Sequence, residues 1–124
     1  MAQNKILVVD DEPKIQLLLT NYFSNRGNDV RAVPSGEDAL EMMEFWNPDL
    51  IFLDIQLPHL NGMDVLKRIK MMNDGIPVVM ISGYATEKMA IKSLELGAMD
   101  YINKPINFKR LEEIVTYVSS VKES

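Results

Sequence analysis

The sequence predicts a single α/β domain in which five helices cover a doubly wound, five-stranded parallel sheet. Short apolar runs alternate with longer amphipathic segments, and the connections between them are short. Four of the runs lack a clean alternation of polar and apolar residues, which is typical of parallel strands covered on both faces. The length of 124 residues fits one domain, so we expect a single domain over residues 1–124.

The strands are expected where Val, Ile and Leu gather in short runs. These runs are KILVV (Lys5–Val9), VRAV (Val30–Val33), DLIFL (Asp49–Leu53), PVVMIS (Pro77–Ser82) and DYIN (Asp100–Asn103). A helix between each pair of parallel strands implies right-handed crossovers.

The first two helices are expected from apolar residues at helical spacing and from capping residues. The apolar stripe of the first consists of Ile15, Leu18, Leu19, Tyr22 and Phe23. Gly27 is placed to end this helix in the left-handed conformation. In the second helix, Ser35 followed by Asp38 predicts the N-cap, and Asn47-Pro48 predicts the end.

Three further helices begin at residues that favour the N-cap, namely Asn61, Thr86 and Asn107. The fourth helix is expected to stop at Gly97. The apolar positions of the third and fifth helices are Met63, Leu66, Ile69, Leu111, Ile114, Val115 and Val118.

Composition narrows the class of protein. The net charge of −5 argues against a broad basic face for direct nucleic acid binding. The absence of cysteine excludes disulfides and thiolate metal sites. No apolar run has membrane-spanning length, and no signal-peptide pattern opens the chain. We therefore expect a soluble, cytoplasmic domain without membrane contact.

Polar residues follow the predicted strands. Asp10 and Asp11 follow the first strand and Asp54 follows the third. Ser82 ends the fourth, and Lys104 follows the fifth. With the strand order 2-1-3-4-5, strands one and three are neighbours at the switch point of the sheet. Three carboxylates, an ammonium and a hydroxyl then converge at one edge.

This group of side chains suits phosphoryl chemistry with a hard cation. Clustered carboxylates raise one another's pKa, whereas a divalent cation keeps them ionised. Two or three carboxylates that leave room for water and phosphate oxygens suit Mg²⁺ better than a Ca²⁺ cage. A carboxylate in such a pocket can itself accept the phosphoryl group as an acyl phosphate.

Over nearly its whole length the chain resembles the receiver domains of two-component response regulators (the CheY-like family). The motifs that carry the resemblance are VVDDEP, LDIQLPHLNG, ISGY and DYINKP, in that order. The resemblance implies a flavodoxin-like fold and a role in two-component or phosphorelay signal transduction. It implies a signalling domain, not an enzyme beyond its own phosphotransfer and slow autodephosphorylation. We expect no output domain within residues 1–124, which could be a stand-alone regulator or the receiver of a longer one.

The resemblance also implies a role for each polar residue. Asp54 would accept a phosphoryl group from a phosphohistidine. Lys104 would pair with that group, and Ser82 would donate its hydroxyl to it. The Mg²⁺ ligands would be Asp10, largely through water, Asp11, Asp54 and the backbone carbonyl of Gln56. Lys104-Pro105 would be a cis peptide bond.

Two surfaces are expected to meet partners. A sensor histidine kinase or phosphotransferase protein would contact the first helix through Ile15 and Leu18, and the loop with Pro105 and Ile106. A downstream effector or an output domain would meet the face formed by the fourth helix, fifth strand and fifth helix, where Tyr101 turns inward.

Two further side chains, those of Gln56 and Tyr84, would flank the path of attacking water.

Other functions remain as alternatives. A receiver-like module could bind partners without phosphorylation, but the complete set of Asp54, Ser82 and Lys104 speaks against it. A metal-dependent aspartyl phosphatase requires two Asp residues spaced two apart on the first strand, and a flavin carrier requires a phosphate loop there; Asp10 and Asp11 fit neither.

Three isolated features have ordinary structural interpretations. Trp46 is expected to pack at the surface before Asn47-Pro48. His59 is expected to be an exposed loop residue. Met71 and Met72 are expected to be partly exposed, and most of the other methionines to lie in the core.

Overall fold

The structure is a computed structural model that describes residues 3–84 and 86–123. Within these residues, strands and helices alternate along the chain. The elements are β1 (Lys5–Val9), α1 (Pro13–Ser24), β2 (Asp29–Val33), α2 (Gly36–Met42), β3 (Leu50–Asp54), α3 (Gly62–Met72), β4 (Val78–Ser82), α4 (Glu87–Glu95), β5 (Asp100–Asn103) and α5 (Phe108–Lys122). The strands pair in parallel in the order β2-β1-β3-β4-β5, which confirms the predicted fold.

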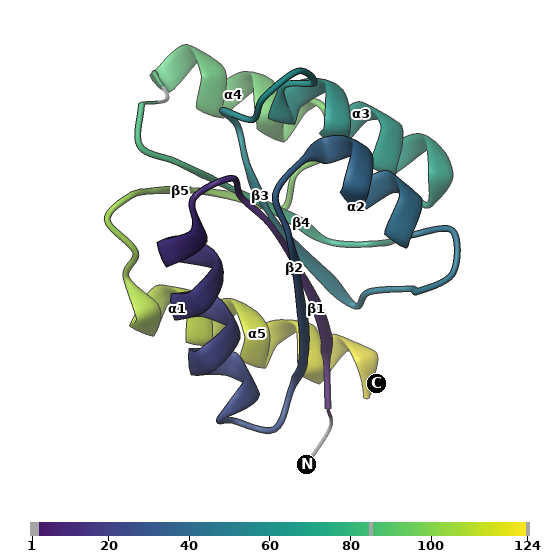
Figure 1. Ribbon diagram of the computed structural model, residues 1–124, viewed down its shortest axis with the longest axis vertical. Helices are drawn as coiled ribbons and strands as arrows, with labels where there is room; N and C mark the ends of the chain where they lie inside the picture. The colour runs from purple at the N-terminus through teal and green to yellow at the C-terminus, as the bar shows by residue number, and fades with distance from the viewer. Residues whose placement is uncertain (1–2, 85, 124) are drawn as a thin grey trace.

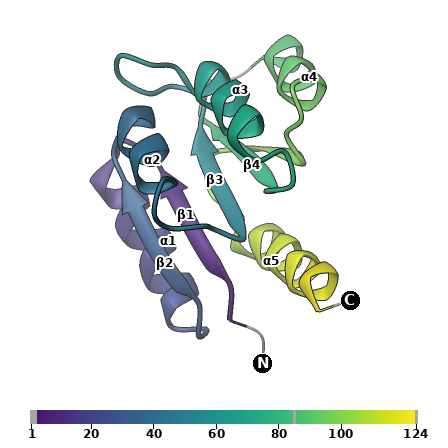
Figure 2. The same ribbon diagram turned by 90° about the vertical axis from the view of Figure 1, so that its right-hand side faces the viewer.

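The sheet separates two layers of helices. Helices α1 and α5 cover one face, and α2, α3 and α4 cover the other (Figures 1 and 2). Successive side chains of β1 point to opposite faces of the sheet. Ile6 and Val8 pack in the core with α1 and α5, whereas Leu7 and Val9 pack in the core on the other face. With both faces filled by apolar side chains, the polar residues that follow the strands are confined to the sheet's edge.

The predicted helix caps are present. The side chains of Ser35, Asn61, Thr86 and Asn107 each accept the backbone N–H of the residue three positions later, at 3.1 to 3.2 Å. Gly97, which follows α4, has a φ of 103°, a left-handed conformation that glycine adopts without strain. Local bonds therefore define where these helices begin and where α4 ends.

Helix α2 is shorter than predicted. It ends at Met42, and the backbone N–H groups of Phe45 and Trp46 both donate to the carbonyl of Met42, at 3.1 and 2.9 Å. This turn directs the indole of Trp46 into the core, where it is only 7% exposed, with the guanidinium of Arg31 4.4 Å from its ring centroid. The prediction that Trp46 packs at the surface is wrong.

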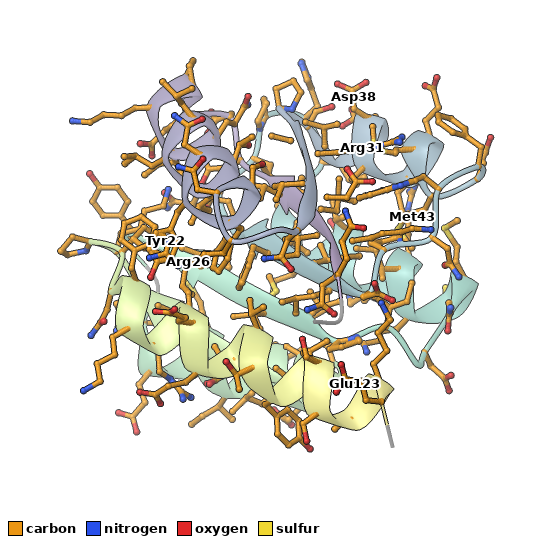
Figure 3. The ribbon with its side chains drawn as sticks, turned by 90° about the horizontal axis from the view of Figure 1, so that it is seen from below. Tyr22, Arg26, Arg31, Asp38, Met43 and Glu123 are labelled. Carbon is orange, nitrogen blue, oxygen red and sulfur yellow. The ribbon has the colours of Figure 1, made fainter. Side chains whose placement is uncertain are left out.

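Helices α1 and α5 are joined by a polar contact beside their shared core. The guanidinium of Arg26 lies 3.6 Å from the ring centroid of Tyr22 (Figure 3). Both side chains bond to Glu112 of α5. On α1, Leu17 and Leu18 are 62% and 41% exposed.

No helix among residues 3–84 and 86–123 is both long and apolar enough to cross a membrane.

Candidate functional site

The pairing of the strands brings the predicted site residues to one edge of the sheet. Val9 of β1 is paired with Leu53 of β3, so Asp10 and Asp54 follow neighbouring positions. Ser82 and Asn103 are paired at the ends of β4 and β5, and Lys104 comes next. The backbone N–H of Lys104 donates to the carbonyl of Ser82 at 2.8 Å, which fixes the start of the loop.

The ammonium of Lys104 is surrounded by carboxylates. Its Nζ lies 3.1 Å from Asp10, 3.2 Å from Asp54 and 3.0 Å from Glu12. The side chains of Asp10 and Asp54 are 4% exposed and that of Lys104 is 14% exposed, whereas the side chain of Glu12 is 56% exposed. Two buried carboxylates and one exposed carboxylate therefore share one cation.

Backbone N–H groups hold the two buried aspartates. Oδ1 of Asp10 accepts the N–H of Glu12 at 2.9 Å, and Oδ1 of Asp54 accepts the N–H of Gln56 at 3.0 Å. The side chain of Gln16 donates to the carbonyl of Asp10 at 2.6 Å. These bonds orient the carboxylates before any ligand binds.

Asp10 and Asp54 have too little positive charge near them to offset the cost of burying their carboxylates. Burial raises the pKa of Asp10 to about 6, and repulsion from Asp54 adds to the effect, while the N–H of Glu12 and the ammonium of Lys104 oppose it. Burial also raises the pKa of Asp54, against the lowering by the N–H of Gln56 and by Lys104, and Asp11 raises it further. A single lysine does not balance the cluster.

The lysine responds in the opposite sense. Burial lowers the pKa of Lys104, but hydrogen bonds to Glu12 and Asp10 and the attraction of Asp10 and Asp54 outweigh burial and raise the pKa overall. Lys104 is therefore a permanent cation at this site.

Gly62 allows α3 to start directly against Asp54. A Cβ at residue 62 would lie 2.2 Å from the backbone carbonyl oxygen of Asp54 and 2.6 Å from Cα of Ile55. The N–H of Gly62 donates to the carbonyl of Ile55 at 2.7 Å. Only glycine leaves room for this close approach, which fixes the backbone behind the Asp54 carboxylate.

A cavity of about 280 Å³ lies in front of these groups. Its lining consists of Asp11, Glu12, Asp54, Gln56, Gly83, Tyr84 and Lys104. Ser82 is fully buried, and its Oγ accepts the N–H of Tyr84 at 3.2 Å. Within the described residues, no hydrogen bond joins the Ser82 hydroxyl to Asp54 or to the Lys104 side chain.

The donor set fits a hard divalent cation. Asp10, Glu12 and Asp54 each offer a carboxylate oxygen, and these oxygens lie within 4.8 Å of one another. Oxygen donors with excess negative charge suit Mg²⁺. Asp11 lines the same cavity without belonging to this trio, whereas Glu12 belongs to it. The sequence shows Glu12 only as the third acid of a run, because the reach of its side chain toward Lys104 depends on the fold.

The peptide bond before Pro105 and the exposure of His59, Met71 and Met72 confirm further predictions. The Lys104-Pro105 peptide bond is cis. Tyr101 is half-buried, and its hydroxyl donates to Oδ1 of Asn103 at 2.8 Å. His59 is exposed, as are Met71 and Met72, as predicted.

Comparisons with known proteins agree on one family. Residues 6–116 match the model of the response regulator receiver domain. Sporulation initiation phosphotransferase F of Bacillus subtilis (strain 168) is 33% identical over 115 residues, which cover 93% of each chain. The alkaline phosphatase synthesis transcriptional regulatory protein PhoP of the same strain is 42% identical over 103 residues, 83% of this chain and 43% of PhoP.

Solved structures give the same result. The receiver domain of NtrX from Brucella abortus is 36% identical, with a TM-score of 0.85 over 91% of this chain and 96% of that one. Some curated relatives are much longer than this chain, which spans only 25% of the regulatory protein AtoC of Escherichia coli (strain K12).

Receiver domains of this kind use Mg²⁺, and they interact with histidine kinases and with effector domains. The cluster of carboxylates and Lys104 lies at the sheet edge where such chemistry is expected. The chain belongs to the family of response regulator receiver domains of two-component systems.

Proposed function

We propose that Asp54 is the phosphoacceptor of this receiver domain and that its donor is a phosphohistidine on a histidine kinase or phosphotransferase protein. The observation that supports this most directly is the position of the Asp54 carboxylate. It lies at the end of β3, lines the 280 Å³ cavity and has the Lys104 ammonium 3.2 Å from Oδ2.

In the proposed reaction, a carboxylate oxygen of Asp54 forms a bond to phosphorus while the bond between phosphorus and the donor's imidazole nitrogen breaks. The electron pair of that bond leaves with the imidazole. Lys104 offsets the charge on the phosphoryl oxygens. Ser82 Oγ accepts the N–H of Tyr84, so its own hydrogen remains available to a phosphoryl oxygen.

Mg²⁺ would supply the remaining positive charge for the carboxylates and the phosphoryl oxygens. We assign its ligands to Asp10, Asp11, Asp54 and the carbonyl of Gln56. Asp10 and Asp54 offer carboxylate oxygens within 4.8 Å of one another, which supports their assignment, and Asp11 and Gln56 line the cavity beside them.

The test is intact-mass spectrometry after incubation with acetyl phosphate, with and without Mg²⁺. We expect one phosphoryl group on the parent chain in the presence of Mg²⁺ and none on Asp54→Asn, because the amide is a poor nucleophile. Asp38→Asn is the matched control, since Asp38 is an exposed carboxylate in the first turn of α2, and we expect it to be modified like the parent.

Modification of Asp54→Asn to the same extent as the parent would move the acceptor to another residue. Absence of an adduct on every variant would instead favour a partner-binding module that works without phosphate, and a partner pull-down would then be the next experiment.

We propose that the kinase surface includes α1 and the loop after β5. Ile15 and Ile106 are only partly buried, Leu18 is 41% exposed, and Pro105 is exposed. The triple variant Ile15→Ala, Leu18→Ala, Ile106→Ala is expected to slow phosphotransfer from the cognate kinase at least about tenfold while leaving modification by acetyl phosphate unchanged. An unchanged rate from the kinase would remove these residues from the interface.

The output surface is proposed to be the face of α4, β5 and α5. Tyr101 is half-buried on β5, and rotation of its ring toward the core would change the exposed shape of this face.

A further inference from the structure

Glu12 contacts Lys104 and belongs to the acidic trio, but it is not among the residues assigned above to Mg²⁺ or to the phosphoryl transfer. It stands at the N-cap of α1, where its side chain forms no capping bond. Within residues 3–84 and 86–123, the Glu12 carboxylate has no hydrogen-bond partner other than Lys104, at 3.0 Å. The side chain is also the exposed member of the cluster. Its place beside Lys104 is therefore held by one ion pair.

The ammonium of Lys104 is surrounded by carboxylates: it donates hydrogen bonds to Glu12 and Asp54 and forms an ion pair with Asp10. A lysine ammonium has three N–H donors, and three carboxylates lie within 3.2 Å of Nζ. A phosphoryl oxygen that bonds to Lys104 therefore competes with these carboxylates for the ammonium.

The three carboxylates differ in how readily they can leave. Asp10 and Asp54 are buried and accept backbone N–H groups, so moving either away from Lys104 would leave a buried charge without its cation. Glu12 can turn into solvent, because an exposed ion pair contributes little. Glu12 is therefore the partner that leaves at the lowest cost.

We propose that Glu12 is a displaceable partner of Lys104. The Glu12 carboxylate binds the Lys104 ammonium while Asp54 carries no phosphoryl group, and a phosphoryl oxygen then takes its place. The inference rests on the proposed function, because it concerns the same acceptor and the same lysine. The exchange replaces one hydrogen bond from Lys104 by another and changes no covalent bond. Glu12 acts through Lys104, as a positioning residue.

The proposal has a kinetic consequence. Glu12 lines the cavity, and its negative charge opposes the entry of an anionic donor. Neutralising it should favour binding of the donor, while Asp10 and Asp54 continue to hold Lys104 for the transfer itself.

The experiment measures the rate of modification by acetyl phosphate as a function of its concentration, at saturating Mg²⁺, for Glu12→Gln. We expect KM to fall about fivefold and the limiting rate to stay within about twofold of the parent value. The difference in KM should shrink between about 0.05 M and about 0.5 M KCl, because salt screens exposed charges. Glu12→Asp, which keeps the charge, should restore a KM within about twofold of the parent value.

Glu44→Gln is the control for the change in net charge, since Glu44 is exposed and follows the far end of α2. A KM for Glu12→Gln equal to that of Glu44→Gln would overturn the inference. So would a limiting rate that falls with an unchanged KM, because Glu12 would then take part in the transfer. If the parent chain accepts no phosphoryl group, the proposed function fails and this inference fails with it; a phosphorylated parent with an unchanged variant KM refutes the inference alone.

Discussion

The two edges of the sheet hold the same kinds of charged group in opposite balance. At the edge where the strands end, Lys104 faces the carboxylates of Asp10, Glu12 and Asp54, with Asp11 close by. The pKa of Asp10 and that of Asp54 are both raised there, so the folded state carries charges that it does not fully compensate.

At the opposite edge, the carboxylate of Asp49 is matched by donors. Oδ2 of Asp49 accepts bonds from Lys122 Nζ at 2.9 Å and from the backbone N–H of Lys5 at 2.8 Å. Lys122 also donates to the carbonyl of Gln3 at 2.8 Å, so the end of α5 is tied to the segment before β1 and to the start of β3.

The difference separates two uses of charge. The edge with Asp49 uses an ion pair to join elements of the fold. The edge with Asp54 keeps excess negative charge. This charge lowers the stability of the domain when no ligand is bound, and it provides a binding site for a cation and a phosphoryl group. Replacing an aspartate by asparagine should therefore have opposite effects on the free energy of unfolding at the two edges.

The largest loss of stability is expected for a substitution at Gly62, because the backbone at the start of α3 lies against the backbone at the end of β3 there. Gly62→Ala places a Cβ 2.2 Å from the carbonyl oxygen of Asp54, and neither backbone segment can move without disturbing β3 or α3. We expect the free energy of unfolding to fall by about 3 kcal/mol, measured by urea denaturation.

Gly83→Ala is the control for Gly62→Ala at the same edge. Its Cβ would have Lys104 Cδ as nearest neighbour, at 3.9 Å, so a change below about 0.5 kcal/mol is expected. Equal losses in the two variants would mean that the close approach at Gly62 does not limit stability.

Asp10→Asn should stabilise the domain in the absence of divalent cations. Burial raises the pKa of Asp10 from 3.8 to about 6 in the folded state, so the folded state binds more protons and the parent loses stability as pH rises from about 4 to about 6. Asparagine does not titrate. We expect the variant to gain about 1 to 2 kcal/mol above pH 7 and nothing below pH of about 4, in denaturation curves recorded across this range.

Asp49→Asn is the matched substitution at the opposite edge. It weakens the bonds to Lys122 and Lys5, so we expect a loss of about 1 kcal/mol at pH 7. Destabilisation by both asparagine variants in metal-free buffer would contradict the proposed contrast between the edges. Mg²⁺ should reduce the advantage of Asp10→Asn and leave the loss in Asp49→Asn unchanged.

Much of the fold could be predicted because its signals are local in the sequence. Apolar runs locate the strands, and single side chains such as Asn61 and Asn107 cap the helices that they precede. The position of Asp54 follows from the same logic, since a carboxylate directly after a fully apolar run must lie at the end of a buried strand.

Features that depend on tertiary contacts could not be predicted. The residues after α2 continue a helical apolar pattern, so the sequence does not show that the turn at Met42 sends Trp46 into the core beneath Arg31. The bond between Glu12 and Lys104 joins residues 92 positions apart, and the Ser82 hydroxyl bonds to its own loop. Neither side-chain direction follows from the order of strands.

The tie between Lys122 and Gln3 also matters for protein engineering. It places both ends of the described chain at the edge of the sheet away from Asp54, about 16 Å from it by the length of a five-residue strand. A fluorophore or affinity tag attached near residue 3 or residue 122 would therefore sit clear of the acceptor cavity. Energy transfer between two such labels would report whether α5 stays docked while Asp54 is modified.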